Sequence, residues 1–342
     1  MTVRFGPRRH LRIASVAVVA AILAAILAMV VALLAAGGVP ESVPAGLSGA
    51  GTTVSWAVPV LRLLADVAAI ACAGGVLAVV LLRPATGGKL TAQELRACQD
   101  AAIAAGVWAV ASIGGLLATA AVILGIPLSQ LSARANDAAA LTQVRALVAA
   151  VVLTAVLAVV LSGCRTVATA RVALVLTAAA LTGPLLTGHS ANEPTVFWSV
   201  LATASLVVHV FAAITWIGGL GALLRYGRSG DPAPPVARFS RLALICAASI
   251  GVTGLLTAEI HLGGREDGWA LITQWVTSGY GAVVFAKAVA FASLVGIGWW
   301  HRRSTLPALE AGKASAFWRL AAAEIVMMAA TVGLAVALSR TP

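Results

Sequence analysis

Residues 13–36 read IASVAVVAAILAAILAMVVALLAA, an apolar run that follows four arginines at positions 4, 8, 9 and 12. As a helix, this run would rise about 36 Å, more than the roughly 30 Å hydrocarbon core of a bilayer. The apolar region of a cleaved signal peptide is shorter, about 7–15 residues. We therefore interpret the run as an uncleaved first membrane span.

Eight further apolar runs follow, at 56–82, 101–126, 143–162, 170–187, 197–224, 240–261, 280–300 and 317–338. Proline and glycine, which end helices, lie in the breaks between them. The chain is 61% hydrophobic and 10% charged, whereas a soluble domain has about a quarter of its residues charged. The sequence predicts an all-α, polytopic transmembrane bundle of about nine spans, with an N-terminal region (1–190, spans 1–5) and a C-terminal region (191–342, spans 6–9).

Lysine and arginine are unevenly distributed between the two sides of these spans. Of 23, 17 precede the first span or fall in alternate breaks, and Arg62 and Lys287 lie inside spans. The other four lie on the opposite side, at positions 134, 145, 265 and 340. Cytoplasmic segments hold the excess of positive charge, so we expect a cytoplasmic N-terminus and an extracytoplasmic C-terminus. The net charge of +11 then reflects topology, and we expect no nucleic-acid partner.

The four cysteines lie in separate segments with no CxxC pair, at positions 72, 98, 164 and 246. This spacing does not indicate a disulfide framework or a zinc site. Cys98 and Cys164 fall at the side that we expect to face the reducing cytoplasm. We interpret all four as buried, small apolar groups, with metal binding as the alternative.

Several ionisable residues lie inside the predicted spans, where each is a candidate for function. Arg62 and Asp66 are four residues apart and share a helix face, either as a structural ion pair or as part of a cavity. His209 lies near the middle of the sixth span, as a packing residue or a metal ligand. Lys287 and Glu324 extend the set from the last two spans, where each can pair or reach the interface.

Three further candidates, Glu259, His261 and His189, lie at the predicted outer ends of spans. Imidazole and carboxylate suit Cu(II), whereas Cu(I) prefers thiolate and thioether. Solvated loop residues are the alternative reading of these three. We find no phosphate-binding loop and no catalytic set, and therefore do not expect an enzyme. A b-type haem protein would need a second intramembrane histidine as partner for His209.

From the sixth span onward, seven features follow in order: His209, Trp216-Ile217-Gly218-Gly219, Arg238-Phe239-Ser240, Gly251-Val252-Thr253-Gly254, Tyr280-Gly281, Lys287 and His301-Arg302-Arg303. In this order they resemble the copper resistance D (CopD) family of bacterial inner-membrane proteins. The composition resembles that of actinobacteria, where this family is often fused to a CtaG-like cytochrome c oxidase assembly domain. The chain ends at Pro342, directly after the last predicted span, so we expect a missing downstream domain of that kind.

The resemblance implies copper handling at the bacterial plasma membrane, as uptake, transport or resistance linked to cuproenzyme assembly. Copper ion would enter near His189, Glu259 and His261 and pass His209. The cavity would be shaped by Lys287 with Arg62 and Asp66, and the small residues of the Trp216, Gly218 and Gly219 motif would pack helices. One alternative is a non-transporting assembly factor with cytochrome c oxidase as partner, and a second is a b-type haem protein.

Overall fold

The computed structural model describes residues 7–40, 49–82, 88–186, 195–227, 232–261, 273–275, 277–311 and 315–341. Regular secondary structure within these ranges is helical. Nine of the described helices are long and apolar enough to cross a membrane. The predicted all-α bundle with nine spans is therefore confirmed for the described part of the chain.

The nine spans are α1 (Pro7–Ala35), α2 (Thr52–Leu77), α3 (Ala92–Leu124), α5 (Thr142–Ser162), α6 (Val167–Leu185), α7 (Val196–Tyr226), α8 (Ala233–His261), α10 (Gly279–Trp300) and α12 (Ser315–Leu338). Shorter pieces join or extend them: the π-helices η1 (Ala78–Leu82) and η4 (His301–Thr305), the 3-10 helix η2 (Leu128–Gln130), and α4 (Ala135–Ala140) and α11 (Leu306–Glu310).

Several helices begin earlier than their apolar runs predicted, and the difference is largest for α3 and α8. α3 begins at Ala92 rather than at 101, because Thr91 and Glu94 form a capping box that satisfies the first free backbone N–H groups. α8 begins at Ala233 rather than at 240. Arg96 and Arg238 therefore lie on the first turns of helices and not in loops.

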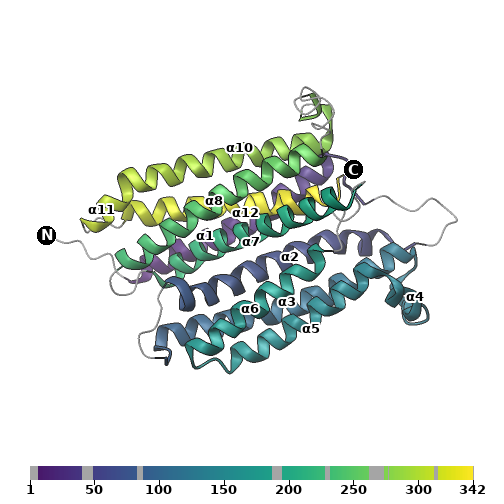
Figure 1. Cartoon of the computed structure of the whole chain (residues 1–342), viewed down its shortest axis with the longest axis horizontal. Helices are drawn as coiled ribbons and strands as arrows, with labels where there is room; N and C mark the ends of the chain where they lie inside the picture. Colours follow the sequence, from purple (N-terminus) through teal and green to yellow (C-terminus); the bar gives the residue numbers. More distant parts are fainter. Residues whose placement is uncertain are drawn as a thin grey trace.

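The helices form two groups that meet along α2 and α7 (Figure 1). The first group contains α2, α3, α5 and α6, and the second contains α7, α8, α10 and α12. Helix α1 lies against α12, the last span, and so belongs spatially to the second group. The predicted division of the chain into two regions at residue 190 stays a prediction. Helix α1 precedes residue 190 in the sequence but packs against α12, which follows it.

Gly74 of α2 and Gly218 of α7 bring the two groups into backbone contact. A Cβ atom on Gly218 would lie 2.8 Å from the carbonyl oxygen of Ile70, and one on Gly74 would lie 2.4 Å from that of Gly218. Real Cβ atoms do not approach backbone this closely, so glycine is required at both positions. We call this contact the α2–α7 seam.

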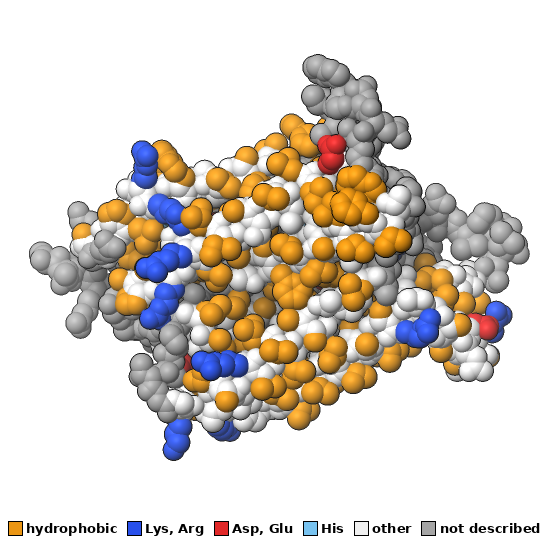
Figure 2. All heavy atoms as spheres, viewed as in Figure 1, with side chains coloured by type: hydrophobic (Ala, Val, Ile, Leu, Met, Phe, Trp, Pro, Cys, Tyr) orange, Lys and Arg blue, Asp and Glu red, His pale blue; other side chains and the backbone are white. Residues whose placement is uncertain are grey.

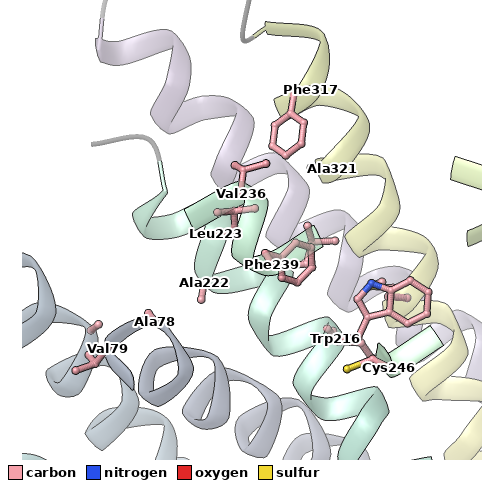
Figure 3. Close-up of a cluster of buried hydrophobic side chains, with 14 of the residues drawn as sticks. Ala78, Val79, Trp216, Ala222, Leu223, Val236, Phe239, Cys246, Phe317 and Ala321 are labelled. Carbon is pink, nitrogen blue, oxygen red and sulfur yellow. The ribbon is translucent and has the colours of Figure 1, made fainter. Parts of the chain in front are cut away.

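A cluster of buried apolar side chains lies beside this seam, toward one end of the second group (Figure 3). Trp216 and Leu223 of α7 contribute to it, together with Phe239 of α8 and Phe317 of α12. Val79 of η1 joins from the first group. The cluster therefore connects both groups through side-chain packing.

The surface has the pattern of a membrane protein (Figure 2). Hydrophobic side chains cover the middle of the molecule, and many lysine and arginine side chains gather at one end. We call this the basic end; it includes Arg96 and Arg225, which line one surface pocket, Arg165, whose carbonyl bonds to Leu90 before α3, and Arg302, which bonds to Ser240 of α8. That the basic end faces the cytoplasm stays a prediction.

Candidate functional site

His209 lies in the middle of α7 and contacts α8 through its imidazole ring. Its Nδ1 is 3.0 Å from Oγ1 of Thr253, and the ring is half-buried. Thirteen residues separate it from the start of α7, about 20 Å at 1.5 Å per residue. The histidine is thus held well inside the membrane by a bond between two spans.

The hydrogen bonds around Thr253 indicate which ring nitrogen of His209 carries the proton. The Thr253 hydroxyl donates to the carbonyl oxygen of Ser249 at 2.6 Å, so its oxygen is left to accept from Nδ1–H of His209. In a neutral imidazole this leaves Nε2 unprotonated, with a lone pair for a metal ion. Ser205 adds a second bond between these helices, from its hydroxyl to the Thr253 carbonyl at 3.3 Å.

Lys287 of α10 brings a positive charge to this site. It is half-buried and acts electrostatically on His209. Nearer the basic end, Trp216 and Phe291 meet edge to face at 6.5 Å, joining α7 to α10. Side chains of the three helices α7, α8 and α10 therefore lie near one another around His209.

The other predicted metal ligands are not gathered around His209. Glu259 follows Thr253 by six residues on α8, so it lies about 9 Å farther along the helix axis. His261 ends α8 but its side chain lies outside the described part of the chain, as does all of His189. Among the described residues, no group of three or more His, Cys, Asp or Glu side chains is arranged to hold a metal ion.

Arg62 and Asp66 form the ion pair that their spacing predicted. The Arg62 Nε and Asp66 Oδ1 atoms are 3.2 Å apart. The side chains of Arg62 and Asp66 are 46% and 31% exposed, so the protein covers this pair only partly.

The three residues of the packing motif on α7 lie in helix contacts. Gly218 lies in the α2–α7 seam, Trp216 lies in the cluster of Figure 3, and Gly219 lies against the Phe239 ring.

A buried histidine–glutamate pair lies near the basic end and was missed as a site by the sequence reading. His301 Nε2 is 3.5 Å from Glu324 Oε2, and both side chains are less than one-tenth exposed. His301 Nδ1 bonds to Thr305 Oγ1 at 2.6 Å across the π-helix η4, a type of turn often found at functional sites. The signal was available: His301 was quoted in the motif and Glu324 as an intramembrane acid, but nothing linked them.

The fold and this site define the class of protein: a multi-pass helical membrane protein with polar groups bonded between spans. Residues 233–338 match the family model of CopD, copper resistance protein D. The part of the chain that contains α8, α10, α11 and α12 is therefore similar to membrane proteins of the CopD family.

The match begins at α8, so His209 and the Trp216 motif, which carried part of the resemblance, lie before it. Thr253, Lys287, His301 and Glu324 lie within it. The search of curated proteins and the search of solved structures returned no match.

Proposed function

We propose that this chain transports copper across a bacterial plasma membrane and that His209 is the intramembrane ligand. The observation that carries the proposal is the hydrogen bond from His209 Nδ1–H to Thr253. It directs the ring and leaves Nε2 available, the arrangement that second-shell bonds give to histidine ligands. The choice of copper as the metal rests on the match of residues 233–338 to the CopD family.

A single imidazole in the middle of the bundle suits transfer better than storage. A transported ion must bind well enough to enter and weakly enough to leave, and a site with many strong ligands would retain it. Lys287 adds to this effect because its positive charge repels a cation at His209. The same helices thus offer a ligand and a charge that promotes release.

Whole-cell copper content tests this proposal. Cells that express the chain, and matched cells that do not, are grown at several copper concentrations, and copper is measured by mass spectrometry. We expect His209→Ala to abolish most of the chain-dependent difference in copper content. Thr154→Val, which lies in α5 of the first group, is the matched control and retains the difference.

The alternative assembly function predicts another result. If His209→Ala leaves cellular copper unchanged while assembly of cytochrome c oxidase fails, the chain is an assembly factor and the transport proposal is wrong. The amount of folded chain is measured by size-exclusion chromatography after extraction from the membrane. Copper contents are then compared between variants that are present in equal amounts.

A further inference from the structure

Cys98 and Cys164 lie 66 positions apart in the sequence, but their sulfur atoms are in contact. The two Sγ atoms are 3.2 Å apart, and both side chains are about 1% exposed. Cys98 is on α3, and Cys164 is in the tight turn between α5 and α6. The two thiols are not joined, since the S–S bond of a disulfide is about 2.05 Å.

A short backbone ladder holds the turn of Cys164 in place. Leu90 N–H donates to the Arg165 carbonyl at 3.3 Å, and Val167 N–H donates to the Gly88 carbonyl at 3.2 Å. These bonds tie the α5–α6 turn to the segment that leads into α3. The position of Cys164 beside Cys98 is therefore fixed by backbone on both sides.

Apart from each other, the two sulfurs have one long polar contact among the described residues, from Cys164 Sγ to the Thr166 carbonyl oxygen at 3.8 Å. Glu94, one turn before Cys98, is buried, but its carboxylate accepts from the backbone N–H and the hydroxyl of Thr91 at 2.7 and 2.9 Å. It is thereby occupied as a helix cap. The residues on either side of Cys164 in the turn, Gly163 and Arg165, are exposed, so the thiols lie only one residue below the surface of the basic end.

Two adjacent thiols are a ligand set for a soft cation. Thiolate sulfur selects Cu(I), which accepts few ligands, while imidazole and carboxylate suit harder ions. With metal–sulfur bonds near the roughly 2.3 Å typical of thiolate ligands, the sulfurs would separate to at most about 4.6 Å in a linear site. Side-chain rotation of the cysteines can supply this change without movement of the helices.

We propose that Cys98 and Cys164 form a two-thiolate site for Cu(I) at the basic end of the bundle. Binding transfers one Cu(I) to the two sulfurs and releases both thiol protons to water, with no change of oxidation state. The bound group carries one net negative charge, which Arg165, the next residue after Cys164, helps to offset. The inference rests on the proposed function in its choice of copper, whereas the sulfur pair itself is independent of His209.

Cu(I) titration of the purified full-length chain tests the site. The chain is kept in detergent, without oxygen and with its thiols reduced, and is titrated with Cu(I) held by the chromophoric chelator bicinchoninate. We expect the wild-type chain to withdraw one more Cu(I) equivalent than either Cys98→Ala or Cys164→Ala. Cys72→Ala and Cys246→Ala are matched controls, since both are buried cysteines on other helices, and they retain the equivalent.

X-ray absorption on the copper-loaded wild-type chain keeps the proposal testable if a variant fails to fold. Two sulfur neighbours per copper support the site, whereas nitrogen and oxygen neighbours alone overturn it. Equal uptake by the wild-type chain and both folded variants overturns it as well. The His209→Ala chain separates the two proposals: we expect it to lose cellular copper transport but to keep this Cu(I) equivalent in detergent.

Discussion

The two helix groups satisfy their buried polar side chains in different ways. In the first group, the hydroxyls of Thr154 and Thr177 donate to carbonyls of their own helices, four residues earlier. In the second group, His209 and Ser205 bond to Thr253 on the next helix, and His301 lies against Glu324 of α12. A hydroxyl that bonds within its own helix does not restrict the position of the neighbouring helices. A hydrogen bond between two helices favours one relative position of the two.

Burial within the protein is highest for α2 and varies widely among the other spans of both groups. The span windows of α2, α3, α5 and α6 are 61%, 39%, 28% and 22% buried within the protein, and those of α7, α8, α10 and α12 are 33%, 22%, 17% and 39% buried. Helices with little protein contact rely more on each individual contact that they make. Apart from α2 the two groups overlap in burial, so the second group differs from the first mainly in its polar bonds between helices.

The largest effect is expected at the α2–α7 seam, on which the two groups depend to stay together. Gly218→Val would place a side chain against the backbone of α2, where a Cβ already meets the Ile70 oxygen at 2.8 Å. Ordinary overpacking costs about 1–3 kcal/mol, and we expect more here because backbone cannot rotate away. Size-exclusion chromatography of the tagged chain should show loss of the folded peak.

Gly221→Val is the matched control for the seam. It lies on the same helix one turn away, but a Cβ there would meet nothing within 4 Å. We expect this variant to fold normally. Equal behaviour of the two variants would show that the seam does not hold the groups together.

A smaller effect is expected from the buried pair of the second group. Glu324→Leu removes the carboxylate 3.5 Å from His301 Nε2, a buried atom that has no hydrogen-bond partner among the described residues, and should lower the free energy of unfolding by about 1–3 kcal/mol. Glu324→Gln keeps an oxygen at the same place and should lose less. Thermal unfolding in detergent measures both, and a Leu variant as stable as the Gln variant would contradict the role of the pair.

The sequence was sufficient for the number and order of the spans because each is long and continuously apolar. It was less exact at their ends: the Thr91–Glu94 capping box extends α3 into a polar stretch that hydropathy excludes. The packing of α1 against α12 also could not be predicted from the sequence. It depends on a close approach at Gly333, where a Cβ would meet the Ala25 carbonyl at 2.0 Å, and pairing of distant helices leaves no local pattern.

For the site, the sequence identified residues but not their partners. His209 was chosen by its depth, yet Thr253 was known only as part of a motif, and the contact between them joins positions 44 apart. Cys98 and Cys164 were interpreted as isolated apolar groups, although their sulfurs meet. In both cases the chemistry depends on which helices pack together, and that is set by small residues spread over the whole chain.

The smallest expected effect most directly tests the difference between the two groups. Thr253→Val and Thr154→Val remove the same hydroxyl from a buried threonine, one bonded between helices and one within its own helix. Hydrogen bonds between membrane helices are worth about 0.6–1.7 kcal/mol, so we expect Thr253→Val to lose about 1 kcal/mol of stability. Thr154→Val should change it by less than about 0.5 kcal/mol, because the helix keeps its backbone bonds.

The same pair of variants separates stability from function. Without the Thr253 oxygen, the His209 proton is free to occupy either ring nitrogen, so Nε2 is available for a smaller fraction of the time. We therefore expect Thr253→Val to reduce the chain-dependent change in cellular copper, while Thr154→Val leaves it intact. If the two variants change stability and copper content equally, bonds between helices carry no special role in the second group, and the distinction between the two groups is wrong.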